Sequence, residues 1–314
     1  MKPAIPRPPP STTTFILLPM ALLAFLYFFL FPLAKELKLQ SLQTTCRRST
    51  FANLTELPIA PKPDFRLFMG ILTHPDHYER RHLLRLVYSL QPNLTTAHVD
   101  IRFVFCNLTK EDQRVLVALE IMRYDDILIL NCTENMDNGK TYAYFSTLPK
   151  LFNTTGDADR PPYDYVMKAD DDIYFRLGRL AQSLKKMPRH DLYYGCAVPC
   201  DRVNPYRHYM SGMGYVLSWD LVQWISTSEI SRNHTVGPED FTTWTWLRDG
   251  NRAKDKFDTK PAMYNYPSGD PCAHDLVPDT IAVHQLKNNL KWARTLKYFK
   301  VTDGLKPSKL YHIS

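Results

Sequence analysis

Residues 163–175 read YDYVMKADDDIYF, an apolar run that leads directly into three consecutive aspartates. The first part of this stretch, residues 163–168, has the length and apolar content of a buried strand. Three carboxylates in a row often form a solvated turn, but apolar residues on both sides draw Asp170–Asp172 into the fold. Carboxylates held close together repel one another unless a cation neutralises them. The stretch therefore predicts a buried strand that ends in a cation site.

Strand and helix patterns alternate on the amino-terminal side of this stretch. The segments with these patterns are, in order, strand 65–72, helix 77–90, strand 99–106, helix 111–123, strand 127–130 and helix 141–152. A repeated β-α-β order predicts an α/β fold whose central sheet is mainly parallel and covered by helices on both faces. Ligands of such sheets bind outside the carboxyl ends of the strands, which is where the three aspartates lie.

The aspartate turn has the chemistry of a metal site that handles phosphate. Carboxylate oxygens are hard ligands that suit Mn²⁺ or Mg²⁺, and these cations also bind phosphate oxygens. A metal ion of this kind acts as a Lewis acid on a departing diphosphate. Asp170 and Asp172 form an Asp-x-Asp pair after a predicted strand, so this turn fits nucleotide-sugar chemistry.

The amino-terminal part of the chain contains a long uncharged segment. Phe15–Ala34 reads FILLPMALLAFLYFFLFPLA, and about 20 apolar residues at about 1.5 Å each suffice to cross a bilayer core. A cleaved signal peptide and a buried helix are the alternatives, but the apolar region of a signal peptide is shorter. We therefore expect a cytosolic tail at 1–14, a transmembrane signal anchor at 15–34, a stem at 35–63 and a lumenal domain at 64–314.

Glycosylation sequons and cysteines indicate that the part after this segment lies in the secretory lumen. All six Asn-x-Thr sequons follow the segment and begin at Asn53, Asn93, Asn107, Asn131, Asn153 and Asn233. The six cysteines favour disulfides, since an even count in a lumenal protein suggests a disulfide framework. Cys196 and Cys200 have no matching second pair with zinc spacing. The pairing of the cysteines stays open.

Length, composition and charge narrow the classes of partner. The chain has 314 residues, of which 44% are hydrophobic and 23% charged, and a formal net charge of +7. These values are typical of one sizeable globular domain with an appendage. A basic surface favours anionic partners such as a nucleotide sugar or an acidic glycan. The sequence contains no nucleic-acid-binding motif, so we expect no nucleic-acid partner.

The order of several motifs resembles the β-1,3-galactosyltransferase family, which includes β-1,3-N-acetylglucosaminyltransferases and Fringe-like enzymes. The resemblance extends from Phe65 to about Trp292. Its motifs are ERRHLLRLVY at 79–88, Glu120 with YDDIL at 124–128, Lys140-Thr141, KADDD at 168–172, YMSGMGY at 209–215 and GPEDF at 237–241. The chain departs from the family at 86–88, where a Thr-Trp pair is usual, and at Phe241, where valine is usual.

The resemblance implies a GT-A type nucleotide-sugar-binding fold and an inverting transfer that forms a β-1,3 linkage. It implies a metal, Mn²⁺ or Mg²⁺, held by Asp170, Asp172 and His284. It also implies donor contacts from Arg81, Arg85, Lys140, Asp170 and Asp171. Surface charge is the competing interpretation of the three basic residues, and a packed core residue is the competing interpretation of His284.

Asp240 is the candidate general base. Inversion by direct displacement needs one base that takes the proton of the acceptor hydroxyl, and the resemblance puts Asp240 of the motif GPEDF in that role. The competing interpretation is that Glu239 and Asp240 follow Pro238 as the acidic first turn of a helix, where carboxylates interact favourably with the helix dipole.

These observations together predict a Golgi, single-pass type II membrane hexosyltransferase. It would move a sugar, in the first instance galactose, from a UDP-sugar to a glycan or glycoprotein acceptor. UDP-N-acetylglucosamine is the nearest alternative donor. A Ca²⁺-dependent glycan-binding protein and an inactive transferase fold kept for assembly are alternatives from other classes. The presence of both metal-turn acids and of the candidate base disfavours the inactive form. The acceptor and the oligomeric state are not determined by these patterns.

Overall fold

The computed structural model describes residues 63–152, 160–200 and 208–306 of the chain. These residues all belong to one compact unit, Pro61–Ser314. The predicted tail, signal anchor and stem lie outside the described residues, as do Cys46 and the sequons at Asn53 and Asn153. Within the described ranges, no helix combines the length and the apolar content that a membrane crossing requires.

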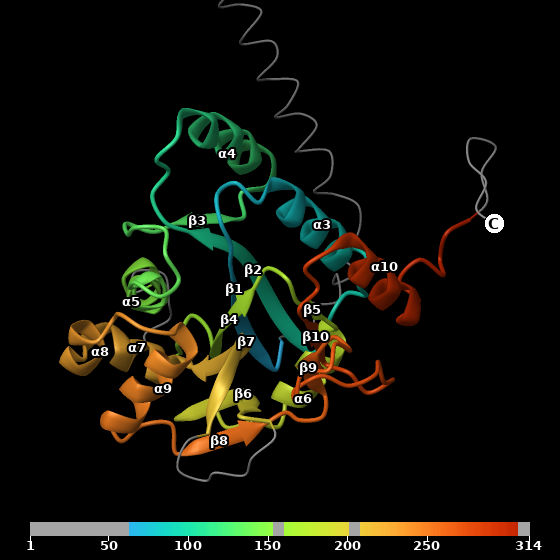
Figure 1. Ribbon diagram of the computed structural model, residues 1–314. Helices are drawn as coiled ribbons and strands as arrows, with labels where there is room; N and C mark the ends of the chain where they lie inside the picture. Colours follow the sequence, from blue (N-terminus) through green and yellow to red (C-terminus); the bar gives the residue numbers. More distant parts are fainter. Residues whose placement is uncertain (1–62, 153–159, 201–207, 307–314) are drawn as a thin grey trace, which may run out of the picture. The chain divides into compact units, whose positions relative to one another are not determined.

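A seven-stranded sheet forms the centre of the structure (Figure 1). Its strand order is β3-β2-β1-β4-β7-β6-β8. The strands are β1 (Phe65–Leu72), β2 (Ala97–Phe105), β3 (Ile127–Ile129), β4 (Tyr165–Asp170), β6 (Leu192–Val198), β7 (Tyr209–Ser218) and β8 (Asp255–Asp258). Only β7 runs antiparallel to its two neighbours, β4 and β6, and the other pairs are parallel. The predicted mainly parallel α/β sheet is confirmed.

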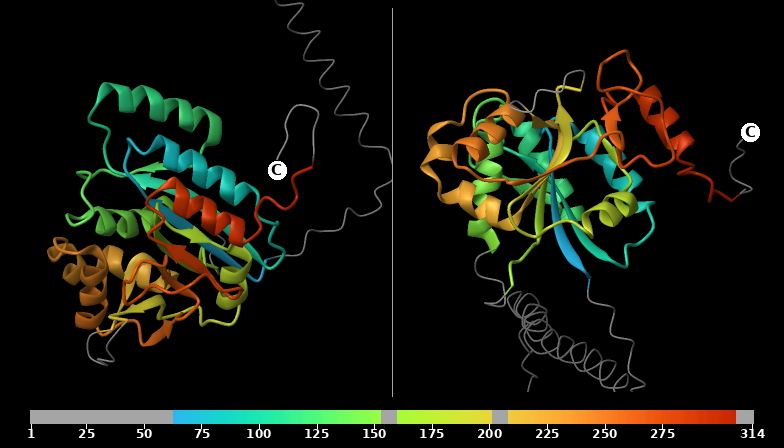
Figure 2. Two further views of the ribbon diagram at one scale, coloured as in Figure 1. Left: turned by 45° about the vertical axis from the view of Figure 1, so that its right-hand side comes forward. Right: turned by 90° about the horizontal axis from the view of Figure 1, so that it is seen from below.

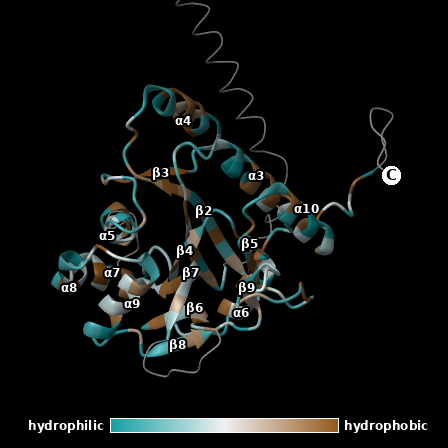
Figure 3. Cartoon of the chain, viewed as in Figure 1, coloured by the Kyte–Doolittle hydropathy of each residue, from teal (hydrophilic) through white to brown (hydrophobic). Residues whose placement is uncertain are grey.

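Helices cover both faces of this sheet (Figure 2). They are α3 (Tyr78–Ser89), α4 (Glu111–Tyr124), α5 (Lys140–Phe152), α6 (Leu177–Leu184), α7 (Trp219–Thr227), α8 (Glu229–Asn233), α9 (Glu239–Asp249) and α10 (Asn289–Tyr298). One apolar core contains residues of α3, α6 and α10, and the other contains residues of α5, α7 and α9. Apolar residues are prominent on the central strands of the sheet (Figure 3).

Strand β1 contributes side chains to both cores. Leu67, Met69 and Ile71 belong to one core, while Phe68 and Leu72 belong to the other, because successive side chains of a strand point to opposite faces. Gly70 lies between them, and a Cβ atom there would be 2.4 Å from the ring of Tyr144. The glycine lets that tyrosine cross the strand and donate a hydrogen bond of 2.9 Å to Met167 O.

The predicted helices and strands agree with the structure to within two residues at most ends. The predicted strand at 163–168 is observed as Tyr165–Asp170, so the first aspartate of the turn is the last residue of β4. A second, three-stranded sheet was not predicted. It has the order β5-β10-β9 and comprises β5 (Tyr174–Phe175), β9 (Met263–Asn265) and β10 (Ala282–His284). Its strands are too short and too distant in sequence to give a local pattern.

Two disulfides confirm the prediction that the cysteines form disulfides. Cys106 pairs with Cys132 across the ends of β2 and β3, and Cys200 pairs with Cys272, 72 residues further on. Cys196 is buried and forms no disulfide within the part of the chain that the structure describes. Closing loops of this length restricts the unfolded chain and stabilises a fold by roughly 3–4 kcal/mol per bridge.

Candidate active site

The carboxyl end of β4 brings the predicted metal ligands together. Ligand atoms of Asp170, Asp172 and His284 all lie within 4.8 Å of one another. His284 Nε2 is 3.5 Å from Asp170 Oδ2 and 3.1 Å from Asp172 Oδ1. Strand β10 delivers the histidine, and Leu286 N donates a hydrogen bond of 2.9 Å to Asp172 O, which ties the two segments together. The site thus joins residues that are up to 114 positions apart in the sequence.

The electrostatics of this cluster are those of a site for a cation. Burial opposes ionisation of Asp170, but Lys168 and His284 outweigh it and lower the pKa of Asp170 to about 2. Burial also opposes the charge of His284, yet Asp170 and Asp172 raise its pKa to about 9. A proton on the imidazole therefore offsets the charge of the two carboxylates. A metal ion at the same place would replace that proton.

Asp171 does not join this cluster and instead faces the loop after β1. Its Oδ2 accepts a hydrogen bond of 2.6 Å from Thr73 Oγ1 and lies 2.8 Å from His77 Nδ1. The hydrogen bond to Asp171 raises the pKa of His77. The middle aspartate of the turn therefore fixes the orientation and the charge of a histidine.

Two adjoining cavities meet at this histidine. The smaller has a volume of about 330 Å³ and is lined by the three aspartates of the turn together with Leu72, Thr73, His74, His77, Glu134, Asn135, Met136 and Lys140. The larger has a volume of about 650 Å³ and is lined by Asp76, His77, Tyr78, Glu79, Arg80, Leu83, Asp171 and Asn289. Since His77 and Asp171 line both cavities, they stand at the boundary between the two.

Lys140, predicted to contact the donor, lies in the wall of the smaller cavity. It is the first residue of α5. Its Nζ forms an ion pair with Glu134 and donates a hydrogen bond of 2.6 Å to Thr73 O. Burial lowers its pKa, against the effect of Glu134. Lys140 therefore provides a positive charge at the edge of the aspartate turn.

Arg81 and Arg85, also predicted to contact the donor, line neither cavity. Arg81 is fully buried and pairs with Glu120, with Nη2 2.6 Å from Oε1. Arg85 Nη1 is 2.6 Å from the other oxygen of Glu120, and its Nε is 2.8 Å from Asp126 Oδ2. Arg81 also donates to the carbonyls of residues 74 and 75. The two arginines thus hold α3, α4 and the loop before α3 together.

The candidate base, Asp240, lies at the start of α9 beside β7. Its Oδ2 accepts a hydrogen bond of 3.0 Å from Gly212 N, and its Oδ1 accepts one of 2.8 Å from Phe241 N. A Cβ atom at Gly212 would be 2.6 Å from Glu239 Oε1. Glycine at this position therefore lets the acidic pair approach the strand. The helix-start interpretation of Asp240 is correct as a description of its place, and it leaves a role as base open.

Two residues that we had not assigned link the metal cluster to α9. Lys168 is fully buried, donates 2.7 Å to Asp170 Oδ1 and 2.5 Å to Gly212 O, and forms an ion pair with Glu239. Glu239 also accepts hydrogen bonds of 3.2 Å from Tyr215 and 3.3 Å from Thr141. Burial raises the pKa of Glu239 to about 7, against the effect of Lys168. Both residues stand inside motifs quoted above, KADDD and GPEDF, which was their only signal.

Comparisons with known proteins agree with the chemistry of this site. Residues 79–204 match the galactosyltransferase family model. Beta-1,3-galactosyltransferase pvg3 of Schizosaccharomyces pombe is 25% identical over 295 residues, which cover 75% of each chain. Beta-1,3-galactosyltransferase 6 of Mus musculus is 29% identical over 229 residues, which cover 64% of this chain and 67% of the relative. Both are proteins to which the chain is similar.

Other relatives are longer than this chain. Hydroxyproline O-galactosyltransferase GALT5 of Arabidopsis thaliana is 26% identical over 54% of this chain, and the match spans 27% of that relative. Among solved structures, a mannosyltransferase from Pyrobaculum calidifontis in complex with GDP-Man and Mn²⁺ is 15% identical, with 83% of this chain and 71% of that chain covered and a TM-score of 0.40.

Proposed function

Because this chain is a glycosyltransferase with a galactosyltransferase-family domain at residues 79–204, we propose that it is a metal-dependent, inverting enzyme of the GT-A type. It transfers galactose from UDP-galactose to a glycan or glycoprotein acceptor and forms a β-1,3 linkage. Its proposed place is the Golgi membrane, with a single-pass type II anchor at Phe15–Ala34 and the folded domain in the lumen, supported by the apolar run and the sequons that follow it.

The cluster of Asp170, Asp172 and His284 carries this proposal. It offers two carboxylate oxygens and one imidazole nitrogen within 4.8 Å, a donor set that suits Mn²⁺. The residues present therefore fit the metal. When bound, the metal ion would neutralise charge on the diphosphate leaving group. Ca²⁺ is bound in proteins through oxygen ligands, so the imidazole favours the transferase over a Ca²⁺-dependent glycan-binding protein.

Basic residues at the cavity boundary support a role in holding the donor. Lys140 lies in the wall of the smaller cavity, and His77 lies between the two cavities with its Nδ1 2.8 Å from Asp171. A cationic imidazole and an ammonium group bind phosphate oxygens through charge-assisted hydrogen bonds. We assign the diphosphate to this boundary. The cavity of about 650 Å³ beyond His77 then provides room for a further part of the bound substrates.

Asp240 takes the proton of the acceptor hydroxyl in this proposal. As the hydroxyl oxygen forms its bond to the anomeric carbon, the bond from that carbon to the diphosphate breaks and UDP leaves with the electron pair. Each oxygen of Asp240 accepts one backbone N–H, and a carboxylate oxygen has a second lone pair. Lys168 connects Asp170 to α9 through Glu239 and so holds the metal turn and the base in a fixed relation.

The test uses the full chain in detergent and measures UDP release from a panel of UDP-sugars, with Mn²⁺, Mg²⁺, Ca²⁺ or chelator. We expect release from UDP-galactose with Mn²⁺ and a glycan acceptor, a β-1,3 linkage in the product by NMR, and no release with chelator. Preference for UDP-N-acetylglucosamine would establish the alternative donor. Glycan binding with Ca²⁺ and no UDP release from any donor would contradict the proposal.

A further inference from the structure

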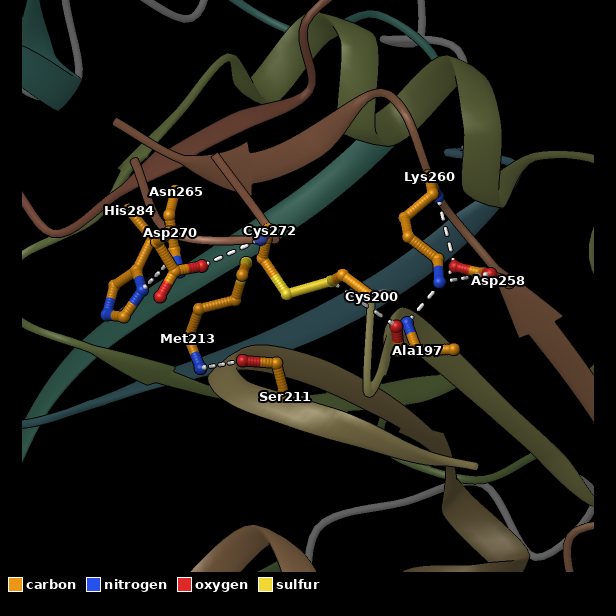
Figure 4. Close-up of a disulfide and its surroundings, with 10 residues drawn as sticks. All are labelled: Ala197, Cys200, Ser211, Met213, Asp258, Lys260, Asn265, Asp270, Cys272 and His284. Atoms are coloured by element: carbon orange, nitrogen blue, oxygen red, sulfur yellow. Dashed lines mark hydrogen bonds and ion pairs between the residues drawn. A yellow bond between two sulfur atoms is a disulfide. The ribbon is translucent and has the colours of Figure 1, made fainter. Parts of the chain in front are cut away.

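A chain of hydrogen bonds runs from His284 to a disulfide (Figure 4). Asn265 and His284 are register partners at the ends of the parallel strands β9 and β10. Asn265 Oδ1 is 2.7 Å from His284 Nδ1, and Asn265 Nδ2 donates 3.1 Å to Asp270 Oδ1. The same oxygen of Asp270 accepts 2.7 Å from Cys272 N, and Cys272 is bonded to Cys200.

The donor and acceptor groups of the three side chains fix the direction of each hydrogen bond between them. An ionised carboxylate only accepts hydrogen bonds, so Asp270 must face the amide nitrogen of Asn265. The amide oxygen of Asn265 then faces the histidine and accepts from Nδ1–H. A neutral imidazole with its proton on Nδ1 carries its lone pair on Nε2. That nitrogen is the one that lies 3.1 Å from Asp172 Oδ1 and 3.5 Å from Asp170 Oδ2.

We infer that Asn265 and Asp270 are positioning residues that hold the imidazole of His284 in the metal-binding orientation, and that the Cys200–Cys272 disulfide anchors them. This inference rests on the metal role of His284 in the proposed function. Partners of this kind orient metal-bound histidines and fix their tautomer. Cys272 contacts the network twice, since its N–H donates to Asp270 and its carbonyl accepts 2.9 Å from Asn265 N.

The disulfide matters because the three-stranded sheet has few residues of its own. Strands β9 and β10 have three residues each and β5 has two. Cys200 follows β6 of the large sheet, so the bridge ties the loop at Asp270–Cys272 to the seven-stranded sheet. The position of His284 relative to β4 is thereby fixed by the three-stranded sheet on one side and, through the disulfide, by the seven-stranded sheet on the other.

The test is Asn265→Ala in the full chain, with Mn²⁺ affinity measured by calorimetry in the absence of any nucleotide. We expect the dissociation constant to rise by about 10- to 100-fold, the usual effect of removing such a partner. The slowly exchanging Nδ1–H resonance of His284, followed by ¹H–¹⁵N NMR, should disappear with and without metal. Asp270→Asn should weaken Mn²⁺ binding less, because an amide can still accept from Cys272 N.

Thr280→Val is the matched control, since it removes a buried hydrogen bond of 2.6 Å to Tyr264 next to the same sheet and does not contact His284. It should leave Mn²⁺ affinity and the Nδ1–H resonance unchanged. Equal losses of affinity in the control and in Asn265→Ala would overturn the inference. If wild type binds no Mn²⁺ but shows the protected resonance, the proposed function fails while the orientation of His284 stands. Absence of the resonance in wild type overturns the orientation itself.

Helix α4 carries a second and independent inference, because its burial pattern is inverted. Its buried residues are Gln113, Val117 and Glu120, two of them polar. Its opposite side exposes Val115, Leu119 and Met122, whose exposed fractions are 57%, 58% and 84%. Figure 1 shows α4 at the margin of the structure, beside α3 and β3. Apolar surface gathered on one helix face marks an interaction site.

The charged residues beside this apolar stripe of Val115, Leu119 and Met122 indicate what kind of partner covers it. Asp112 and Arg123 are eleven residues apart, so at 3.6 residues per turn they return to within about 20° of one another on the same flank of the helix. No ion pair among the described residues includes either side chain. An antiparallel pair of α4 helices related by a two-fold axis places Asp112 of each copy beside Arg123 of the other. A parallel pair would place like charges together.

The geometry points to a second copy of this chain as the occupant, bound through an antiparallel α4–α4 contact around Val115, Leu119 and Met122. Such an interface is isologous and closes on itself. It lies on the outer side of α4, whereas the polar inner side is occupied by the contacts of Glu120 with the arginines of α3. The stripe thus lies on the opposite side of α4 from Gln113, which donates a hydrogen bond to Asp76 in the wall of the larger cavity.

Sedimentation of the detergent-solubilised full chain tests this contact. Leu119→Glu should raise the dimer dissociation constant by about 100-fold, and Leu305→Glu, at another exposed leucine, should not change it. Asp112→Arg and Arg123→Asp should each weaken the dimer by about 10-fold, and the double exchange should restore it. Val115→Cys chains mixed with Met122→Cys chains should form crossed disulfides. A monomeric wild type, or a dimer insensitive to Leu119→Glu, would overturn the inference.

Discussion

Two largely buried charge networks, one around Glu120 and one at the end of β4, differ in their balance of charge. The first joins Arg81 and Arg85 to Glu120 and Asp126. Its two guanidinium groups match its two carboxylates, and Arg81 uses its further N–H groups on backbone carbonyls. A network that is balanced and fully hydrogen-bonded offers few free donors, so we expect its effect to be on the fold.

The second network has more carboxylates than permanent cations. Lys168 faces both Asp170 and Glu239, and Asp172 is offset by the proton that its neighbourhood places on His284. Clustered carboxylates of this kind favour an added cation. Burial and ion pairing alone therefore do not mark a functional site, since both networks have them. What distinguishes the site is the unbalanced charge beside a cavity.

The largest expected effect is that of removing a carboxylate from the unbalanced network. Asp172→Asn should lower turnover by about 10³-fold or more, because the proposed metal, which would assist departure of the diphosphate, would no longer be held. The fold should persist, with at most a small decrease in melting temperature, because Asp172 also pairs with the protonated imidazole of His284. UDP release and calorimetric Mn²⁺ binding measure the change. Asp279→Asn, at an exposed aspartate, is the control, and normal turnover in Asp172→Asn would remove Asp172 from the metal site.

The same type of change in the balanced network should act on stability. Glu120→Gln leaves the buried Arg81 with a neutral partner, while the partly buried Arg85 keeps Asp126. It should destabilise the fold by about 3–5 kcal/mol, the usual effect of breaking a buried ion pair. Urea denaturation measures it, with the exposed Glu111→Gln as control. Turnover per folded molecule should remain close to wild type. A loss of turnover without a loss of stability would give this network a catalytic role and would end the contrast.

Acid should weaken the balanced network in the wild type as well. Burial opposes ionisation of Glu120, but the two arginines outweigh it and lower its pKa below 4.5. A carboxyl whose pKa is lower in the fold than in the unfolded chain stabilises the fold above pH ~4.5 and loses that contribution as the pH falls through its folded pKa. In Glu120→Gln, the part of the acid destabilisation that comes from this group should be absent from denaturation curves measured between pH 5 and 3.

Substitution of Asp240, at the edge of the unbalanced network, tests whether this carboxylate is a catalytic base or only an acidic residue at a helix start. The expected effect is smaller. Asp240→Asn still accepts the hydrogen bond from Gly212 N but cannot take a proton. If Asp240 is the base, kcat should fall by about 10²-fold, or about 3 kcal/mol of barrier, with donor affinity and melting temperature unchanged. Asp249→Asn, at the other end of α9, should have no effect. Wild-type kcat in Asp240→Asn would assign this carboxylate to the helix start alone.

The smallest effect concerns His77, which lies at the boundary of the two cavities beside Asp171. His77→Gln should weaken UDP affinity by about 10-fold, with His98→Gln, at an exposed histidine, as control. The hydrogen bond to Asp171 raises the pKa of His77 above 6.5, so the cation is present at low pH. UDP binding should therefore weaken as the pH rises through the pKa of His77, and His77→Gln should flatten that dependence. Identical pH profiles for the two proteins would exclude His77 from the diphosphate contact.

Local patterns in the sequence predicted the regular elements of the larger sheet. Strand β1, helix α3 and the strand before Asp170 each show their period within about ten residues, so their existence could be predicted from neighbouring residues alone. The aspartate turn was found for the same reason, because all its carboxylates are contiguous. Residues that act with distant partners, such as Asn265 and Lys168, had no local signal of that role.

What the sequence determined by itself is thus the α/β alternation, the aspartate turn at Asp170–Asp172 and the presence of disulfides. Only the tertiary structure decided which partner each charged side chain contacts. It gave Arg81 a buried carboxylate as partner, with Glu120 39 residues away, and it brought Glu239 to Lys168 across 71 residues. The physical reason is that a period in sequence reflects burial along one element. The partner of a charge is chosen through space, between elements whose contact no local pattern encodes.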